Sequence, residues 1–370
     1  MKRLTLISIC ISTLSYSQSL YQKMESIRRH YRLPEMGYAV ISSQQVIDVQ
    51  VCGYHRIDQQ TKVDTANIKD HFHLGSNTKA ITGFIAAYLV EQGKIKWDTK
   101  FFDLYPEMKK DTKPAYYNIT LQQLLSHRAG IQPFTSGEKE KAPKVNGTRS
   151  AQRKAFAKYV LEQPPVPPDK NKDFAYSGEG YVYSNAGYSI ASLMLEKVTG
   201  KSWEQLVREI INYKLQLKTN FGWPNETDSI HQPWGHWVDN DHLVPLSPSF
   251  PYHLNLIEPA GDINMSLPDY SVFIQLQLQG LKGNDRIISA ESYKFLHFGI
   301  KGYSIGWLNG TNKSGKRYSA HEGSAGTFHV ITVVYPDDDR AYIICINAES
   351  ENTNKAKDEL LKYLQSSYNN

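Results

Sequence analysis

Hydrophobic residues alternate with polar ones in two separate parts of the chain, one near each end. Between Gly37 and Gly53 the alternation is interrupted once, by the polar run at residues 42–45, which predicts two strands joined by a turn. The same pattern returns at residues 327–335 and 340–347, with a proline and three aspartates between them, and predicts a second hairpin. Strand-forming sequence therefore lies at both ends of the chain.

Apolar residues at spacings of three and four predict helices elsewhere. One series begins shortly after Ser76 and stops before Gly93, a residue type common at helix ends. A second series covers residues 190–198 and stops before Gly200, and a third, at residues 355–364, predicts a closing helix. The members of the first series are Ile81, Phe84, Ile85, Tyr88 and Leu89.

This order of elements predicts the α+β class. We expect an antiparallel sheet built from both chain ends and flanked by helices, with a mainly helical second lobe. The mature chain, residues 18–370, is predicted to form a single domain. Its sheet lobe would take about residues 20–75 and 285–370, and its helical lobe about residues 76–284.

Three stretches have the composition of loops. Residues 135–150 are polar and charged, residues 163–173 are rich in proline, and residues 220–255 hold tryptophans and histidines among prolines. A long aromatic loop can wall a functional cleft or pack as a small satellite core. The sequence leaves both roles open for residues 220–255.

The first 17 residues resemble an export signal. They combine a basic start, an apolar run at residues 4–14, and small residues at Ser15 and Ser17 that suit cleavage before Gln18. The apolar run is too short to span a bilayer. We therefore expect a secreted or periplasmic protein with no stable membrane span after cleavage.

Composition narrows the class of protein. Hydrophobic residues make up 40% and charged residues 21%, which excludes the disordered and collagen-like classes. The net charge is +5, but the basic residues are scattered, so no nucleic-acid partner is expected. The mature chain keeps Cys52 and Cys345, both in strand-like segments, and a disulfide or two separate buried thiols are both open.

Ser76 and Lys79 provide the candidate chemistry. They lie three residues apart at the start of the predicted helix, which places them close to one face. A serine hydroxyl becomes a nucleophile when a neighbouring group takes its proton, and a lysine can do so when burial lowers its pKa. The helix start also offers free N–H groups for negative charge on an attacked carbonyl.

Three motifs in a fixed order carry a family resemblance. Ser76–Lys79 is followed by Tyr183–Asn185 and His321–Gly323, and the chain also holds Leu124–Gly130 and Pro259–Asp262. In these motifs the chain resembles the serine β-lactamase and penicillin-binding-protein superfamily, and is most similar to its class C-like branch of esterases and D-peptidases. The partners of such a protein would be a small-molecule or peptide substrate.

Each motif also has a chance copy. Ser136–Lys139 repeats the first motif, but it lies in a charged loop without an amphipathic helix. Tyr116–Asn118 and Tyr368–Asn370 repeat the second motif, and His297–Gly299 repeats the third. None of these copies has the surrounding elements that the chemistry requires.

The resemblance implies a role for each matching residue. Ser76 would form an acyl-enzyme, and Lys79 and Tyr183 would transfer protons. The lysine charge would favour the phenolate form of Tyr183. No metal or cofactor is implied. The backbone N–H groups of Ser76 and Ser324 would form the oxyanion hole, and Asn185, His321 and Gly323 would contact the substrate.

The third motif departs from the pattern of the β-lactamases and DD-peptidases, which usually begin it with a lysine that holds a substrate carboxylate. His321 is largely neutral at pH 7 and Glu322 adds negative charge, so strong β-lactam hydrolysis is not expected. The resemblance implies a secreted hydrolase of esters or peptides, including D-residue peptides. A class C-like β-lactamase or DD-carboxypeptidase, and a sensor that acylates without turnover, stay open.

His71 and His73 are two histidines close together in the chain, a pattern that can indicate a metal site. The two histidines lie in the strand-like segment that leads to Ser76. No third ligand follows at a spacing typical of zinc sites. The sequence therefore predicts no metal there.

Overall fold

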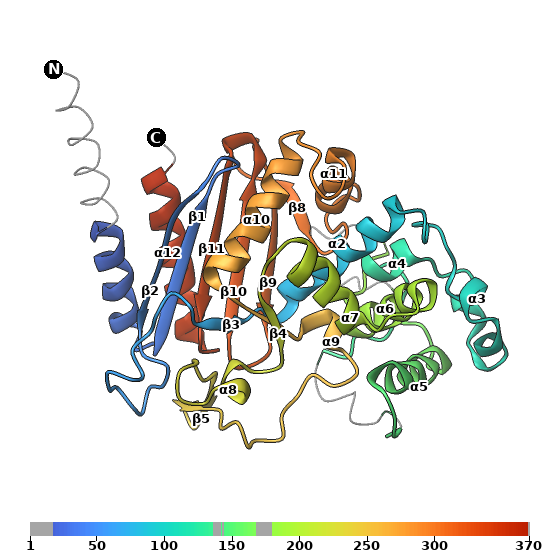
Figure 1. Cartoon of the computed structure of the whole chain (residues 1–370), viewed down its shortest axis with the longest axis horizontal. Coiled ribbons are helices and arrows are strands. Elements are labelled where there is room, and N and C mark those ends of the chain that lie inside the picture. Colours follow the sequence, from blue (N-terminus) through green and yellow to red (C-terminus); the bar gives the residue numbers. More distant parts are fainter. Residues whose placement is uncertain (1–17, 136–141, 143, 168–179, 369–370) are drawn as a thin grey trace.

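A six-stranded antiparallel sheet organises the fold of the computed structural model, which describes residues 18–135, 142, 144–167 and 180–368 (Figure 1). The strand order is β2-β1-β11-β10-β9-β8. The predicted export signal lies outside the described residues. The strands are β1 (Glu35–Ile41), β2 (Val46–Gly53), β8 (Leu308–Thr311), β9 (Arg317–Ser324), β10 (His329–Tyr335) and β11 (Arg340–Ile346).

The two ends of the chain meet in the middle of this sheet. Strand β1 pairs antiparallel with β11, and Met36 lies opposite Ile346. Both predicted hairpins are present, as β1–β2 and β10–β11. The predicted α+β class is confirmed.

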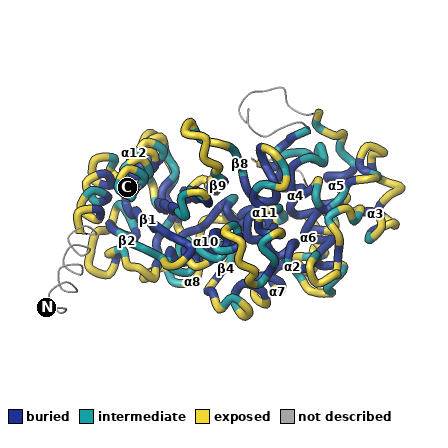
Figure 2. The backbone as a smooth tube through the Cα atoms, turned by 90° about the horizontal axis from the view of Figure 1, so that it is seen from above, coloured by how far each residue is buried: buried dark blue, intermediate teal, exposed yellow. Residues whose placement is uncertain are grey.

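Both faces of the sheet are covered, so its strands contribute to two apolar clusters. All seven residues of β1 are buried, and Figure 2 shows the strand within the buried part of the molecule. A helix at residues 18–30 and α12 (Glu351–Tyr368) cover one face, while α10 (Leu267–Leu281) covers the other (Figure 1). The first two helices contribute Leu20, Met24, Ile27, Ala356, Leu360 and Leu364 to the core.

The second lobe is mainly helical and packs around two buried helices. Helix α2 (Thr78–Glu91) and helix α6 (Asn185–Thr199) bury most of their residues. The Ser184 hydroxyl caps α6 by accepting from the N–H of Gly187, and Gly200 ends it at φ 70°. The other helices are α3 (Phe101–Leu104), α4 (Leu121–Leu125), α5 (Arg149–Glu162), α7 (Trp203–Val207), α8 (Pro224–Thr227), α9 (Glu258–Gly261) and α11 (Ala290–Phe298).

Short strands connect the two lobes. A three-stranded sheet has the order β3-β7-β4, and a separate hairpin is formed by β5 and β6. That hairpin lies inside residues 220–255, which were expected to be a loop throughout. The strands are β3 (His71–His73), β4 (Thr219–Phe221), β5 (His236–Asp239), β6 (His242–Pro245) and β7 (Ile263–Ser266).

Two further expectations need correction. The helix at residues 18–30 was not predicted, although it supplies part of the core. Helix α10 contacts β1, β2 and β11, so the sheet lobe includes residues that were assigned to the helical lobe when its boundary was set at residue 284. The reason is that the apolar face of α10 covers the sheet. Residues 163–167 of the proline-rich stretch form no helix or strand, as expected, and residues 168–173 lie outside the described residues.

The two cysteines are free, buried and on different strands. Cys52 on β2 and Cys345 on β11 flank β1 from opposite sides. Strands two places apart are about 10 Å from each other, which is beyond the Cα separation of a disulfide. Among the described residues, no helix is both long and apolar enough to cross a membrane.

Candidate active site

Ser76 lies in a tight turn between β3 and α2. The turn, Gly75–Asn77, is a 3-10 helix, and Gly75 adopts the left-handed φ of 52° that favours glycine. The buried side chain of Asn77 fixes it by donating to the carbonyls of Leu74 at 3.2 Å and Val330 at 2.9 Å. The turn is therefore anchored to the main sheet as well as to its own helix.

Lys79 lies beside the Ser76 hydroxyl and is fully buried. Its Nζ is 3.0 Å from Ser76 Oγ, 2.8 Å from Asn185 Oδ1 and 2.9 Å from the Ala260 carbonyl oxygen. Burial lowers the pKa of Lys79 well below its usual value. A neutral amine has two N–H bonds, which the two carbonyl oxygens can accept, and one lone pair, which then faces Ser76.

Tyr183 approaches Ser76 from the other side. Its hydroxyl donates to Ser76 Oγ at 2.7 Å, and Lys79 Nζ lies 4.7 Å from the centre of its ring. Burial raises the pKa of Tyr183, and the hydrogen bond to Ser76 offsets only part of that rise. Burial thus opposes the phenolate form that the resemblance implied for Tyr183.

Gly323 brings strand β9 against the Ser76 turn. A Cβ atom at Gly323 would lie 2.2 Å from the Leu74 carbonyl oxygen and 2.7 Å from the Ser76 nitrogen. A Cβ atom at Gly75 would lie 2.7 Å from the nitrogen of Ser324. The amides of Ser76 and Ser324 are thus close together, as an oxyanion hole requires.

Next to Gly323, strand β9 pairs with a described strand on one side only. Residues 321–324 pair with β10, whereas β8 pairs only with residues 317–320 of β9. The missing side chain of Gly323 makes room for the Ser76 turn, and its predicted contact with the substrate stays a prediction.

His321 is buried and does not line the cavity beside Ser76. Its Nδ1 lies 3.0 Å from the Glu322 carbonyl oxygen, and its Nε2 lies 3.2 Å from the Tyr303 hydroxyl. Burial and the nearby Lys79 lower the pKa of His321 to about 3. The ring is neutral at pH 7 and contacts Tyr303, while its predicted contact with the substrate stays a prediction.

The Glu322 side chain belongs to a separate ion cluster. It lies 2.6 Å from both His329 Nε2 and Lys357 Nζ, and His329 Nδ1 lies 2.8 Å from Glu349. Burial opposes ionisation of His329, but the two glutamates outweigh it and raise the pKa to about 9. The negative charge expected beside His321 is therefore paired elsewhere.

A cavity of about 820 Å³ opens beside Ser76. Asn185 and Ser324 contribute polar groups to its wall, and residues 251–257 form much of the opposite side. The aromatic stretch 220–255 serves both expected purposes, because Tyr252 lines the cavity while Trp223 is buried and stacks on the Tyr252 ring at 5.5 Å. Apolar wall residues include Phe134, Ala142, Val145, Leu254, Leu256 and Ile257.

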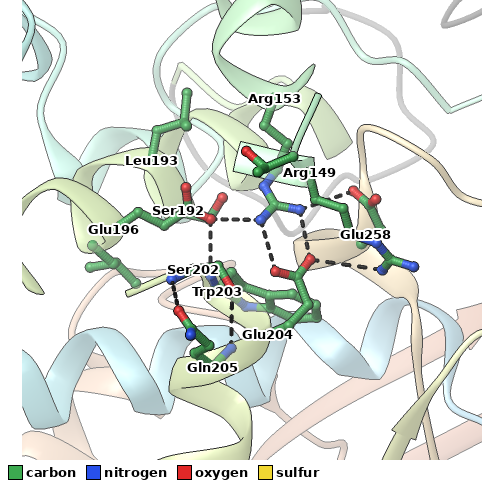
Figure 3. Close-up of polar contacts among 12 residues, drawn as sticks. Arg149, Arg153, Ser192, Leu193, Glu196, Ser202, Trp203, Glu204, Gln205 and Glu258 are labelled. Atoms are coloured by element: carbon green, nitrogen blue, oxygen red, sulfur yellow. Dashed lines mark hydrogen bonds and ion pairs between the residues drawn. The ribbon is translucent and has the colours of Figure 1, made fainter. Parts of the chain in front are cut away.

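Arg153 anchors the helices behind this wall (Figure 3). Its guanidinium lies 2.6 Å from Glu196, 2.8 Å from Glu204 and 3.4 Å from Glu258, and these residues come from α6, α7 and α9. Burial raises the pKa of Glu258 to about 7. Glu258 begins the short helix whose Ala260 carbonyl contacts Lys79, so the cluster positions that carbonyl.

Comparison with known proteins identifies the family of this chain. A family model described as Beta-lactamase matches residues 20–366. The chain belongs to the beta-lactamase family. Its six-stranded sheet and helical lobe are the beta-lactamase and penicillin-binding-protein fold, as the resemblance implied.

Relatives in the family are distant in sequence. Protein flp of Staphylococcus aureus (strain MW2) is 22% identical over 349 residues, which cover 92% of this chain and 65% of that protein. The chain thus spans less than two thirds of the length of this curated relative. Penicillin-binding protein 4 of Amycolatopsis lactamdurans is 23% identical over 327 residues, covering 85% of this chain and 81% of that protein.

Solved structures show the same fold. The octameric penicillin-binding protein homologue from Pyrococcus abyssi has a TM-score of 0.71 at 20% identity, covering 90% of this chain and 74% of that chain. FmtA from Staphylococcus aureus has a TM-score of 0.69 at 18% identity, covering 93% of this chain and 89% of that chain.

Sequence reasoning missed several residues of this beta-lactamase-family site. Tyr303 and Arg153 had no recognisable spacing to the three motifs, and Ala260 acts through its backbone. Of the chance copies, His297 is buried against Ser319 at 2.7 Å, and Tyr116 is buried in the core. The Ser136 copy lies outside the described residues.

His71 and His73 contact different groups and do not face a common point where a metal could bind. His71 Nδ1 lies 2.8 Å from Asn264 Oδ1, whereas His73 Nδ1 accepts from the N–H of Gly75 at 3.3 Å. Both rings therefore support the strand that leads to Ser76.

Proposed function

We propose that this chain is an exported serine hydrolase that forms an acyl-enzyme on Ser76 and acts on esters or peptides. One observation carries the proposal: Ser76 Oγ lies within hydrogen-bond distance of both Lys79 Nζ, at 3.0 Å, and the Tyr183 hydroxyl, at 2.7 Å. Membership of the beta-lactamase family supports an acyl-enzyme reaction. The basic and apolar pattern of residues 1–17 supports export.

Acylation starts at the lysine. Neutral Lys79 takes the proton of Ser76 as Oγ attacks the carbonyl carbon of the substrate. The amides of Ser76 and Ser324 stabilise the negative charge on the carbonyl oxygen. The bond to the leaving group then breaks, Tyr183 gives that group its proton, and the proton on Lys79 restores the phenol. Lys79 is thus the base and Tyr183 the acid.

Deacylation uses the same base. Neutral Lys79 takes a proton from a water molecule as the water oxygen attacks the acyl carbon, the bond to Ser76 Oγ then breaks, and Lys79 returns the proton to Oγ. Asn185 holds the lysine through its 2.8 Å contact and lines the cavity, so it can also meet the substrate. No cofactor takes part in these steps.

The environment of the third motif favours neutral substrates. His321 is buried and uncharged at pH 7, so β9 offers no cation there for a substrate carboxylate. The apolar wall near residues 251–257 suits an acyl group with aliphatic or aromatic side chains, including a D-residue peptide. For these reasons we place esters and peptides before β-lactams, and a class C-like β-lactamase or DD-carboxypeptidase second.

The decisive experiment measures hydrolysis of p-nitrophenyl acetate, short D-residue peptides and a chromogenic cephalosporin by the purified mature chain. Ser76→Ala should abolish all turnover, whereas Ser136→Ala, the matched control from the chance copy, should retain it. Equal turnover by Ser76→Ala and the parent would refute the proposal. Fluorescent penicillin that labels Ser76 persistently, without product release, would favour the sensor alternative.

A further inference from the structure

Three ionisable side chains meet in the core, away from Ser76. Glu35 begins β1, His55 follows β2, and Asp70 precedes β3. One ligand atom from each lies within 4.8 Å of the other two, and His55 Nε2 is 3.0 Å from Asp70 Oδ2. All three residues are buried, with exposures of 0%, 2% and 1%. Their positions in the chain gave no sign of this meeting.

The cluster combines two carboxyl groups with few polar partners. Neither carboxylate oxygen of Glu35 has a hydrogen-bond partner among the described residues, and the same holds for His55 Nδ1. The guanidinium of Arg28, which acts on Glu35 electrostatically, donates to Glu25 at 2.6 Å and to the Leu33 carbonyl at 2.8 Å.

A buried carboxylate without a partner is costly unless a cation or a proton neutralises it. We propose that Glu35, His55 and Asp70 form a structural binding site for a divalent metal ion of the zinc type. Two carboxylates and one neutral imidazole around a doubly charged ion give a site with no net charge.

The donor set selects the class of metal. Zinc is bound by histidine nitrogen and carboxylate oxygen, while calcium and magnesium prefer oxygen ligands alone. Two ligand atoms of a tetrahedral zinc ion lie about 3.4 Å apart, because each bond is about 2.1 Å long. The three ligand atoms now lie within 4.8 Å of one another, so an ion would draw them together by up to roughly 1.4 Å.

Outer contacts already hold one ligand in place. Asp70 accepts from the backbone N–H of Asn67 at 2.5 Å and from its side-chain amide at 2.7 Å. Hydrogen bonds of this kind orient the ligands of metal sites. An ion here would join the starts of β1 and β3 to the end of β2, and β3 leads directly to the Ser76 turn.

The test uses the mature chain without an affinity tag, loaded with ZnCl₂ and desalted. We expect about one zinc ion per chain by elemental analysis, and at least a tenfold lower content in Glu35→Gln. Asp58→Asn, which removes an exposed carboxylate from the same connection between β2 and β3, is the matched control and should keep the metal.

Thermal unfolding supplies a readout that does not depend on catalysis. Adding zinc to the chelator-treated chain at 100 times Kd should raise Tm by roughly 4 °C, and the same addition should leave the Tm of Glu35→Gln unchanged. If that variant does not fold, chelation of the parent chain still tests the site. A parent chain that keeps no zinc and shows no shift in Tm would overturn the proposal, as would equal zinc in Glu35→Gln. Either result would favour a proton shared by Glu35 and Asp70.

Discussion

Replacing Gly323 by alanine tests whether the missing side chain at this position is needed to make room for the Ser76 turn. The added Cβ would lie 2.2 Å from the Leu74 carbonyl oxygen, 2.7 Å from the Ser76 nitrogen and 2.9 Å from the Asn77 nitrogen. These neighbours are backbone atoms, so no side-chain rotation can relieve the overlap. Ordinary contact begins near 3.4 Å, which means that strand and turn must separate by about 1 Å.

The separation should damage the reaction more than the fold. A displacement of about 1 Å at a reacting group can reduce the rate about 100-fold, which corresponds to roughly 2.7 kcal/mol of activation free energy. Overpacking of this kind lowers the free energy of unfolding by about 1 to 3 kcal/mol. The variant should therefore remain folded at 25 °C and lose most of its kcat.

The assay compares a small ester with a larger peptide substrate. If Gly323 makes room for the turn, kcat should fall about 100-fold for both substrates, because Ser76 itself has moved. Gly310→Ala on strand β8 is the control, since the atoms nearest to its Cβ would be those of the Tyr318 side chain, at 3.2 Å or more. The reasoning is refuted if p-nitrophenyl acetate is hydrolysed at the parental rate and only the larger substrate loses kcat/KM.

Three further outcomes follow from the described contacts. Tyr183→Phe should lower kcat by about 10²- to 10⁴-fold with little change in Tm, because it removes the proton donor at 2.7 Å from Ser76; a loss under tenfold would contradict that role. The pKa of His329 is about 9 in the folded chain against 6.5, so its ion pairs stabilise the fold fully below pH 6.5, and this stabilisation is lost as pH rises through 9. His329→Gln should therefore flatten the dependence of Tm on pH between 6.5 and 9, and an unchanged slope would argue against the ion cluster. Reducing agent should leave Tm unchanged, because Cys52 and Cys345 are free thiols, and a fall in Tm would indicate a disulfide.

Much of the fold could be predicted because local signals agree with the tertiary structure. The two hairpins combine alternation with turn residues, and α2 combines helical spacing with the left-handed Gly93. The helix at residues 18–30 was not predicted, because its three apolar positions, Leu20, Met24 and Ile27, form a short series directly after the export signal. The hairpin of β5 and β6 was missed because its strands have four residues each.

The sequence predicts which residues form the site, but it does not predict their protonation states or their burial. The motif order identified Ser76, Lys79 and Tyr183, which the structure brings into contact. The protonation of Tyr183 and the burial of His321 depend on residues far along the chain, such as Tyr303, so spacing could not reveal them. Likewise, the Glu35 cluster forms only when three strands come together.

Because β1 pairs with β11, the central sheet can form only after nearly the whole chain has been synthesised. During synthesis the residues of β1 leave the ribosome roughly 300 positions before their partners, as Met36 and Ile346 show. Contacts this distant slow folding, because a long loop must close before they form. Until β11 arrives, one edge of β1 remains unpaired and open to association with other chains. Deletion of the last hairpin should therefore remove the sheet as well as the support of the nucleophile.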